Sequence, residues 1–407
     1  MQTNKNENSV NRSFITVILM FCTSLFAASV LTINIAGFKL SVFRLLIIIC
    51  FAYLCVTSNK KYNIYSAIMI FWLLWGIVSF IFVSDKGEWF KEVFFLIVAA
   101  TSVEFFSRKM DSKQLLINMC EVFSLFIGIH NIIGYYEIIT RNYSWVSPEL
   151  AKTYGFIYGH IPVSVFFNSN NYATVLLFGV AITAIAIKYA NPKMKIIYII
   201  IMASSLLQIF LSLSRANLIA LTIGVIVFFF IKRVKNHNKL VLFTMLLVLF
   251  GIVLVTPIGT SIITKVGSFF NFNISNGSES LRITLLHYGW ESFKKTYFWG
   301  TGAGNLPVMI NNISGIAGGQ LHFWWLEVLF TYGPLIWMLY IYSYIKLLKD
   351  NFRGTAQGSF VSRVLVSYML AYIVGACSSS SVMSLEPTWI AWAFIIGYRV
   401  NYESIGL

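Results

Sequence analysis

Apolar segments of about 20 residues recur along most of this 407-residue chain. A helix of that length crosses the roughly 30 Å hydrocarbon core of a bilayer. Hydrophobic residues make up 58% of the chain and charged residues only 11%, with a mean hydropathy of +0.76, which lies outside the range of soluble domains. The sequence therefore predicts an all-α polytopic membrane protein in which residues 1–407 form a single membrane domain.

Twelve segments are long and apolar enough to be predicted spans. The first follows Arg12 and resembles a signal peptide, but many further spans follow it, so we expect a retained helix. The predicted spans are Phe14–Ala36, Leu40–Thr57, Ile64–Val83, Val93–Phe106, Leu115–Gly134, Tyr172–Ile187, Ile196–Leu211, Ala216–Ile231, Leu240–Pro257, Phe323–Ile345, Val364–Ser380 and Pro387–Tyr398.

The distribution of lysine and arginine predicts the orientation of these spans. Basic residues favour cytoplasmic loops. If the N-terminus lies in the cytoplasm, the cytoplasmic segments hold 19 of the 30 basic residues. The other 11 are spread over the longer segments outside the membrane. We therefore expect a multi-pass protein of the cytoplasmic (inner) membrane with both termini in the cytoplasm. The same dispersal of the net charge of +15 argues against a nucleic-acid partner and leaves the lipid bilayer as the expected partner.

Residues 258–322 form one long segment that this topology places outside the cell. Asn276-Gly277-Ser278 is a helix-start signal, and the residues up to Tyr297 have the spacing of a helix with an apolar face. This segment is rich in aromatic residues and carries Lys294 and Lys295, so we expect a helix lying along the membrane interface. Gly300, Gly302 and Gly304 are expected to end it.

Arg215 is the first candidate for chemistry because it follows the turn Ser212-Leu213-Ser214 at the outer mouth of two adjacent spans. A guanidinium at this position offers a rigid fork of donors that suits phosphate or diphosphate oxygens. The alternative is an arginine that only anchors a helix end at the headgroups. The nearby polar groups of Ser214 and Asn217 favour anion binding, since an anchor does not need them.

Two further outer residues complete the predicted catalytic set. Arg282 could meet the same anion, and two arginines together neutralise a doubly charged leaving group; the alternative is an exposed surface charge. His322 could accept a proton from an attacking hydroxyl near neutral pH, or be an ordinary interfacial residue. Glu327 is a weaker candidate for orienting His322, and His160 is a reserve histidine.

Other polar residues and the cysteines give weaker signals. Arg44, near the outer end of the second span, is predicted either to line the same cavity or to form a structural ion pair. The five cysteines have no metal-ligand spacing, so we expect neither a metal site nor disulfides. There is no Asp-x-Asp motif and no phosphate-binding glycine loop, which disfavours a metal-dependent cytosolic nucleotide donor and predicts no cofactor.

From about Phe167 to the C-terminus the chain resembles the O-antigen polymerase and ligase family, the Wzy-like membrane enzymes. The resemblance rests on the order of four short motifs, and Asn170 lies in the first of them. These are Asn168-Ser169-Asn170-Asn171-Tyr172, Ser212-Leu213-Ser214-Arg215, Leu281-Arg282 followed by Gly300-Thr301-Gly302-Ala303-Gly304, and the spacing from His322 to Gly333. Phe323 and Pro334 depart from the family pattern, which favours polymerase over ligase.

The resemblance implies a GT-C-like membrane fold and metal-independent, inverting glycosyl transfer at the outer face. Undecaprenyl-diphosphate-linked repeat units would be joined into an O-antigen or capsule, with a flippase and a chain-length regulator as partners. Arg215 and Arg282 would hold the donor diphosphate and His322 would act as base, with Ser214, Asn217, Asn170, Glu327 and Arg44 as substrate-binding residues. One alternative is a ligase that transfers finished glycan to a lipid or wall acceptor, and another is a transporter of lipid-linked oligosaccharide.

Overall fold

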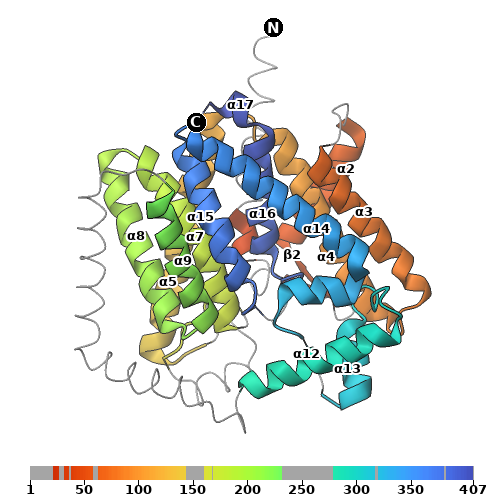
Figure 1. Ribbon diagram of the computed structural model, residues 1–407. Coiled ribbons are helices and arrows are strands. Elements are labelled where there is room, and N and C mark those ends of the chain that lie inside the picture. Colours follow the sequence, from red (N-terminus) through yellow and green to blue (C-terminus); the bar gives the residue numbers. More distant parts are fainter. Residues whose placement is uncertain are drawn as a thin grey trace.

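The computed structural model describes residues 22–26, 32–35, 38–57, 63–143, 160–166, 168–231, 278–316, 320–379 and 382–406. Apart from one short hairpin, its regular elements are helices (Figure 1). The helices are η1 (Ser24–Phe26), α2 (Val42–Thr57), α3 (Ile64–Val78), η2 (Ser79–Ile81), α4 (Lys86–Lys109), α5 (Lys113–Thr140), α7 (Ser169–Tyr189), α8 (Pro192–Leu211), α9 (Arg215–Phe230), α12 (Ser278–Lys295), α13 (Leu306–Ser314), α14 (Trp324–Ala356), α15 (Phe360–Gly375), α16 (Glu386–Val400) and α17 (Tyr402–Ile405).

The prediction of an all-α polytopic membrane protein is confirmed. Within the described ranges, five helical segments are long and apolar enough to cross a membrane, and α9 and α15 are shorter apolar helices. The five are Ile64–Ile81, Lys113–Thr140, Ser169–Tyr189, Pro192–Leu211 and Trp324–Ala356. The total of twelve spans stays a prediction, and the predicted span Leu240–Pro257 lies outside the described residues.

The end of the predicted first span is wrong. Strand β1 (Thr32–Ile35) occupies positions that were expected to be helical, and it pairs antiparallel with β2 (Phe38–Ser41). The β-branched residues of β1 favour a strand. Only two residues, the second of them Gly37, separate the paired Ile35 and Phe38, which is the spacing of a tight hairpin.

The helix starts follow from capping residues in the sequence. The side chains of Asn63, Asp85, Ser112, Asn168, Asn191 and Ser359 each accept a hydrogen bond from a backbone N–H in the first turn of the following helix. Such caps satisfy donors that the helix itself leaves unpaired. Pro192, at the start of α8, needs no partner for a backbone N–H.

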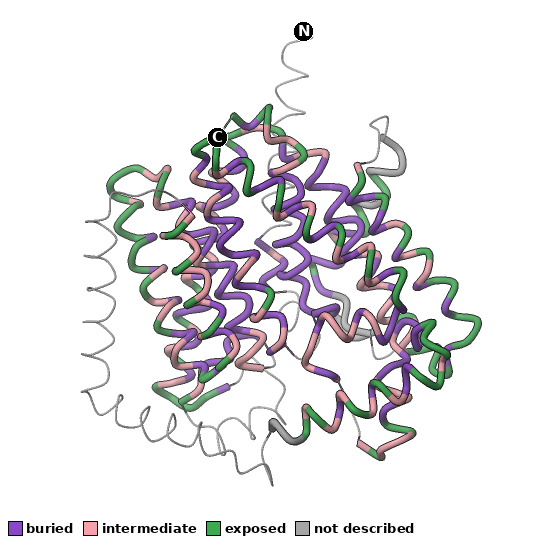
Figure 2. Tube along the Cα trace, in the orientation of Figure 1, coloured by how far each residue is buried: buried purple, intermediate pink, exposed green. Residues whose placement is uncertain are grey.

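The bundle has a fully buried centre. Helix α16 packs against α4, and α15 packs against α9. All residues of α16 from Glu386 to Tyr398 are buried, whereas the outer faces of α3 and α8 are exposed (Figure 2). An exposed apolar face suits contact with lipid chains rather than water.

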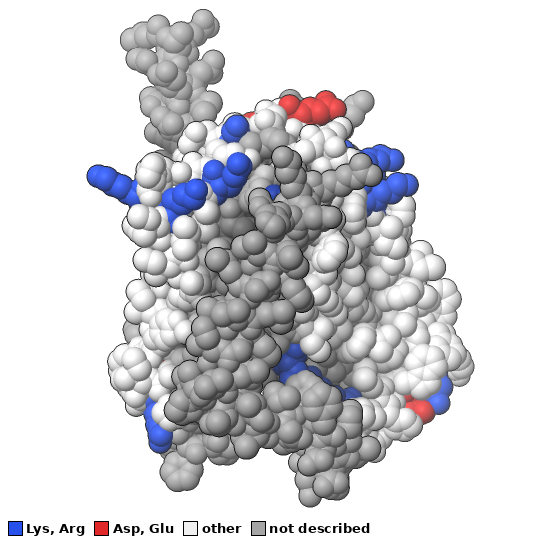
Figure 3. All heavy atoms as spheres, turned by 60° about the vertical axis from the view of Figure 1, so that its left-hand side comes forward, with Lys and Arg blue, Asp and Glu red and all other residues white. Residues whose placement is uncertain are grey.

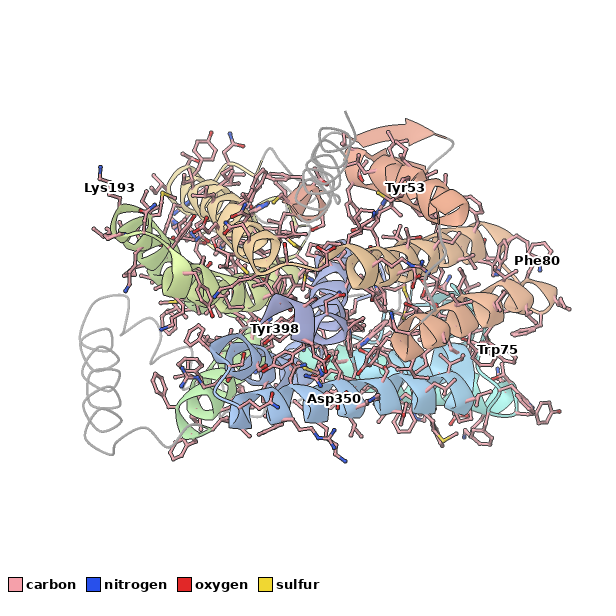
Figure 4. All side chains as sticks on the ribbon, turned by 90° about the horizontal axis from the view of Figure 1, so that it is seen from above. Tyr53, Trp75, Phe80, Lys193, Asp350 and Tyr398 are labelled. Carbon is pink, nitrogen blue, oxygen red and sulfur yellow. The ribbon has the colours of Figure 1, made fainter. Side chains whose placement is uncertain are left out.

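Basic side chains are concentrated at the end of the bundle that carries α17. On the face shown in Figure 3 most lysine and arginine side chains lie at that end. Lys193 lies there at the edge of the bundle, as the view from that end shows (Figure 4). Helices α12 and α13 lie at the opposite end (Figure 1). This asymmetry is what a basic inner face and a long outer segment would produce.

Helix α12 is the helix predicted after Ser278, and it ends at Lys295. With α13 it packs on the first part of α14 around a small core formed by Leu285, Phe293, Leu306, Ile310, Leu321 and Phe330. The interfacial position of α12 stays a prediction.

Helix α14 is interrupted at Gly333, which has φ 82° and ψ 174°. Pro334 has no N–H to donate to the carbonyl of Phe330, and the kink also leaves the carbonyl of Thr331 without its helical partner. The backbone N–H groups of Thr301 and Gly302 donate to these two carbonyls, each over 2.8 Å. The loop after α12 is therefore hydrogen-bonded into the kink of α14.

Gly300, Gly302 and Gly304 all have positive φ, so their residue type is required by the backbone. A Cβ atom on Gly300 would lie 2.6 Å from the backbone nitrogen of Gly333, and one on Gly304 would overlap the carbonyl oxygen of Glu88. The prediction that these glycines end α12 is wrong, because the helix ends at Lys295 and the turn after it already has positive φ at Tyr297 and Phe298. The three glycines allow the loop to approach the backbones of α14 and α4 closely.

Candidate functional site

The N-terminal ends of α7 and α9 meet at a buried polar centre, the side chain of Asn217. Its Nδ2 lies 2.7 Å from Ser378 Oγ, 2.9 Å from Ser214 Oγ and 3.2 Å from the carbonyl oxygen of Asn170. Asn217 is fully buried, as is Ser214 at 2% exposure. The structure therefore brings together three of the predicted substrate-binding residues and uses their polar groups to join helices.

The turn before α9 buries its two serine side chains and leaves Arg215 exposed. Leu213 adopts the left-handed conformation, with φ 55°, while Ser212 Oγ donates to the carbonyl of Ile209 and accepts from the N–H of Ser214. As a result Ser212 and Ser214 are buried, and Arg215 is exposed at the first position of α9. The serines shape the turn, and the guanidinium of Arg215 is placed at the surface of this end of the bundle.

His322 lies in the connection between α13 and α14 and has the left-handed conformation, with φ 53°. Its imidazole makes a hydrogen bond with the backbone of Ser379, in the turn that follows α15. Its Nδ1 is buried and has no hydrogen-bond partner within the described residues. Since the neighbouring Ser378 contacts Asn217, one short turn connects His322 to the start of α9.

Arg282, on the first part of α12, lies close enough to His322 and Cys377 to act on both electrostatically. Burial is the main cause that lowers the pKa of His322 below its ordinary value of 6.5, and the positive charge of Arg282 lowers it further. The hydrogen bond with Ser379 opposes these two effects. His322 is therefore held as a neutral imidazole at pH 7, the form that accepts a proton.

Basic side chains occupy a hollow in the half of the molecule away from α17 (Figure 3). Arg282 acts electrostatically on His322, and hydrogen bonds through Asn217 and the Ser378–Ser379 turn join His322 to the start of α9, where Arg215 is the first residue. The three predicted catalytic residues therefore lie at one end of the bundle, on separate elements.

Two predicted substrate-binding residues lie elsewhere. Glu327 is near the phenol of Tyr332, whose hydroxyl donates to Glu92 Oε1 over 2.9 Å. Arg44 is 6% exposed, and its Nε and Nη2 lie 2.8 Å and 2.5 Å from Glu386 Oε1. The geometry of Arg44 favours the ion-pair alternative over a place in the cavity.

His160, the reserve histidine, lies in a different polar group. Its Nε2 is 2.7 Å from Arg141 Nη2, and its Nδ1 is 2.8 Å from the carbonyl oxygen of Ile138. These contacts hold residues 160–166 on the end of α5. They do not connect His160 to Arg282 or His322.

The turn Cys377-Ser378-Ser379 was not among the predicted site residues. Ser379 Oγ donates to Asn171 Oδ1 over 2.8 Å, so the turn links α7, α9 and His322. The signal in the sequence is the run of four serines from Ser378 to Ser381 at the end of the predicted span Val364–Ser380. As for metals, no three His, Cys, Asp or Glu side chains within the described ranges are placed to hold an ion.

Comparison with known proteins agrees with the motifs. Residues 199–341 match the O-antigen ligase family model, a range that contains Arg215, Arg282 and His322. The chain is also 25% identical, over 413 aligned residues, to the teichuronic acid biosynthesis protein TuaE of Bacillus subtilis (strain 168), covering 93% of this chain and 82% of the relative. The protein is therefore a multi-pass membrane protein that is similar to the O-antigen ligase family over residues 199–341 and to a teichuronic acid biosynthesis protein over most of its length.

Proposed function

We propose that this protein is a glycosyltransferase that joins undecaprenyl-diphosphate-linked repeat units at the outer face of the cytoplasmic membrane. The observation that carries the proposal is the placement of Arg282 beside the neutral imidazole of His322. A cation next to a base suits a reaction in which an anion leaves while a hydroxyl loses its proton. Arg215, exposed at the start of α9, adds a second cation at the same end of the bundle.

The reaction that fits these residues is an inverting displacement. The acceptor hydroxyl oxygen attacks the anomeric carbon of the donor glycan, and its proton passes to His322. The bond between that carbon and the diphosphate oxygen breaks, and undecaprenyl diphosphate leaves. Arg215 and Arg282 stabilise the negative charge on the departing diphosphate. This route uses no metal ion, and it assigns the two arginines to the leaving group and His322 to the proton of the acceptor.

The buried residues around this centre act as positioning groups. Asn217 and Ser378 fix the start of α9 relative to the turn that holds His322. A displacement of a reacting group by about 1 Å can lower a rate by about 100-fold. We therefore assign Asn217, Ser214 and Asn170 to positioning rather than to direct contact with the glycan.

A polymerase is the favoured activity because Phe323 and Pro334 depart from the family pattern, and this departure counts more against a ligase than against a polymerase. The relative in Bacillus subtilis is named for teichuronic acid biosynthesis, which supports glycan assembly rather than transport. A ligase is the second candidate, and the match to the O-antigen ligase family model favours it. The two differ only in the acceptor, so the same cations and base serve both.

The test is the size distribution of lipid-linked glycans in a strain that lacks the gene. We expect single repeat units to accumulate, and we expect wild type but not Arg282→Ala or His322→Ala to restore long chains at equal protein level. Long chains that remain unattached would identify a ligase instead. Wild-type chain lengths with both variants would contradict the proposed roles, and an unchanged profile in the deletion strain would favour transport.

A further inference from the structure

A second cavity lies at the far end of α12 from Arg282. Arg282 and Lys295 are separated by 13 residues of this helix, or about 20 Å. The cavity encloses about 590 Å³, which is within the range of small-molecule sites. Trp75 of α3 points toward it, between α3 and the α12–α14 side of the molecule (Figure 4).

The cavity is held in shape by the glycine loop. Gly302 packs against the α3–α4 turn so closely that a Cβ atom would lie 2.6 Å from Val83 Cγ1. Asn305 Oδ1 accepts from the Ser84 hydroxyl over 2.6 Å, and its Nδ2 donates to the carbonyl of Thr301 over 2.9 Å. The walls are therefore cross-linked by hydrogen bonds between the α3–α4 connection, the loop and the start of α13, so the site is pre-formed rather than assembled by a ligand.

The lining combines aromatic faces with neutral polar groups. Trp75, Phe82 and Trp299 supply the aromatic surface, and Ser84, Asn305 and Asn312 supply hydroxyl and amide groups. The indole of Trp299 is 67% exposed, so its face is available. The described lining residues include no charged side chain. A phosphate or carboxylate would find no countercharge there, because anion sites in proteins are built from cations or clustered donors.

Accessible polar groups in the wall argue against a purely apolar occupant. Ser84 and Asn312 are exposed residues of the lining, with a hydroxyl and a side-chain amide. A lipid chain in the cavity would displace water from these groups without replacing its hydrogen bonds, which is unfavourable. A ring with apolar C–H faces and several hydroxyls matches aromatic walls and neutral amides together.

We propose that this cavity binds a neutral sugar of the glycan. The bound sugar would be several sugar units along the glycan from the end that reacts. Its identity as the glycan under assembly rests on the proposed function, whereas sugar binding itself does not. A holding site remote from the chemistry would keep a growing chain on the enzyme between additions. It would also make the affinity for the glycan depend on glycan length, because only chains long enough to reach the cavity gain the extra contacts.

Binding is tested on the full protein in lipid nanodiscs by calorimetric titration. The probe is the neutral oligosaccharide of one to three repeat units, released from the strain's surface polysaccharide and free of diphosphate. We expect Trp299→Ala to weaken its binding at least tenfold and Asn312→Ala, at an exposed position of α13, to weaken it severalfold. Tyr297→Ala is the matched control, since Tyr297 is 85% exposed in the same turn and does not line the cavity.

Arg282→Ala separates this proposal from the proposed function. We expect that variant to bind the neutral oligosaccharide within twofold of wild type while losing chain growth. Retained chain growth in Arg282→Ala would refute the catalytic proposal and leave the sugar site standing. The sugar site is refuted if wild type does not bind the probe, or if Trp299→Ala and Asn312→Ala both bind it as wild type does.

Discussion

The side-chain amide of Asn217 lies 2.7 Å from the hydroxyl oxygen of Ser378, which joins the start of α9 to the turn after α15. Both residues are buried. The next residue, Ser379, bonds to His322 through its backbone and to Asn171 through its hydroxyl. Through these bonds four segments far apart in the sequence are fixed to one another around the proposed site.

Asn217→Ala should lower stability and abolish glycan assembly. The substitution removes the hydrogen bond from Asn217 to the buried hydroxyl of Ser214 and one of the two hydrogen bonds of the Ser378 hydroxyl, at a cost of about 1–3 kcal/mol. Thermal unfolding in detergent measures the loss. Thr222→Ala, on an exposed part of the same helix, is the control and should unfold as wild type does. Equal transition temperatures for the two variants would rule out the joining role of Asn217.

His322 should make the rate of the transfer reaction fall at low pH, which is the acid limb of the pH–rate profile. Because burial and Arg282 lower its pKa below 6.5 in the folded protein, the imidazole is neutral at pH 7, and kcat/KM should fall only as the pH drops through that lowered pKa. The lowered pKa also means that the unfolded chain binds this proton more readily than the folded protein. The free energy of unfolding should therefore fall as the pH drops below 6.5, the ordinary pKa of histidine. Arg282→Gln should move the acid limb of residual activity to higher pH. A limb at the same pH in wild type and variant would contradict the coupling.

The glycine loop lies so close to α4 that replacing a glycine by alanine should lower stability more at Gly304 than at Gly315. Gly304→Ala places a Cβ atom on the carbonyl oxygen of Glu88, whereas Gly315→Ala meets nothing within 4 Å although Gly315 also has a positive φ. Gly315→Ala should cost about 1 kcal/mol from backbone strain alone. Gly304→Ala should cost clearly more, measured by thermal unfolding. Similar losses for the two would show that the contact with α4 is unimportant.

Arg44 and Glu386 should behave as a structural pair. Removing one charge, as in Arg44→Met, leaves a buried carboxylate without its partner and should cost about 3–5 kcal/mol. The double variant with Glu386→Gln should recover much of that stability, and chain growth with it. If the double variant regains stability but not chain growth, Arg44 also serves the substrate.

Most helices could be predicted from the sequence, because apolar length and capping residues act locally. The signal at Ser278 predicted the start of α12 correctly. The hairpin of β1 and β2 was missed since an apolar, β-branched run in a predicted span reads equally well as a helix. Its strand form depends on pairing that hydropathy does not report.

The site was predicted in part. The order of motifs pointed to Arg215, Arg282 and His322, and the structure places them at one end of the bundle. The sequence could not show that Arg44 pairs with Glu386, which is 342 positions away. Nor could it show that the glycine cluster fits the kink at Gly333, because both contacts depend on how distant helices pack.

The most direct test of the central claim uses purified protein in lipid vesicles with a lipid-linked repeat unit as donor and acceptor. Release of undecaprenyl diphosphate is measured together with glycan length, in the presence of a metal chelator. The account predicts that wild type releases one undecaprenyl diphosphate for each unit added, and that His322→Ala and Arg282→Ala are slower by about 100-fold or more. Equal rates for wild type and both variants would contradict it.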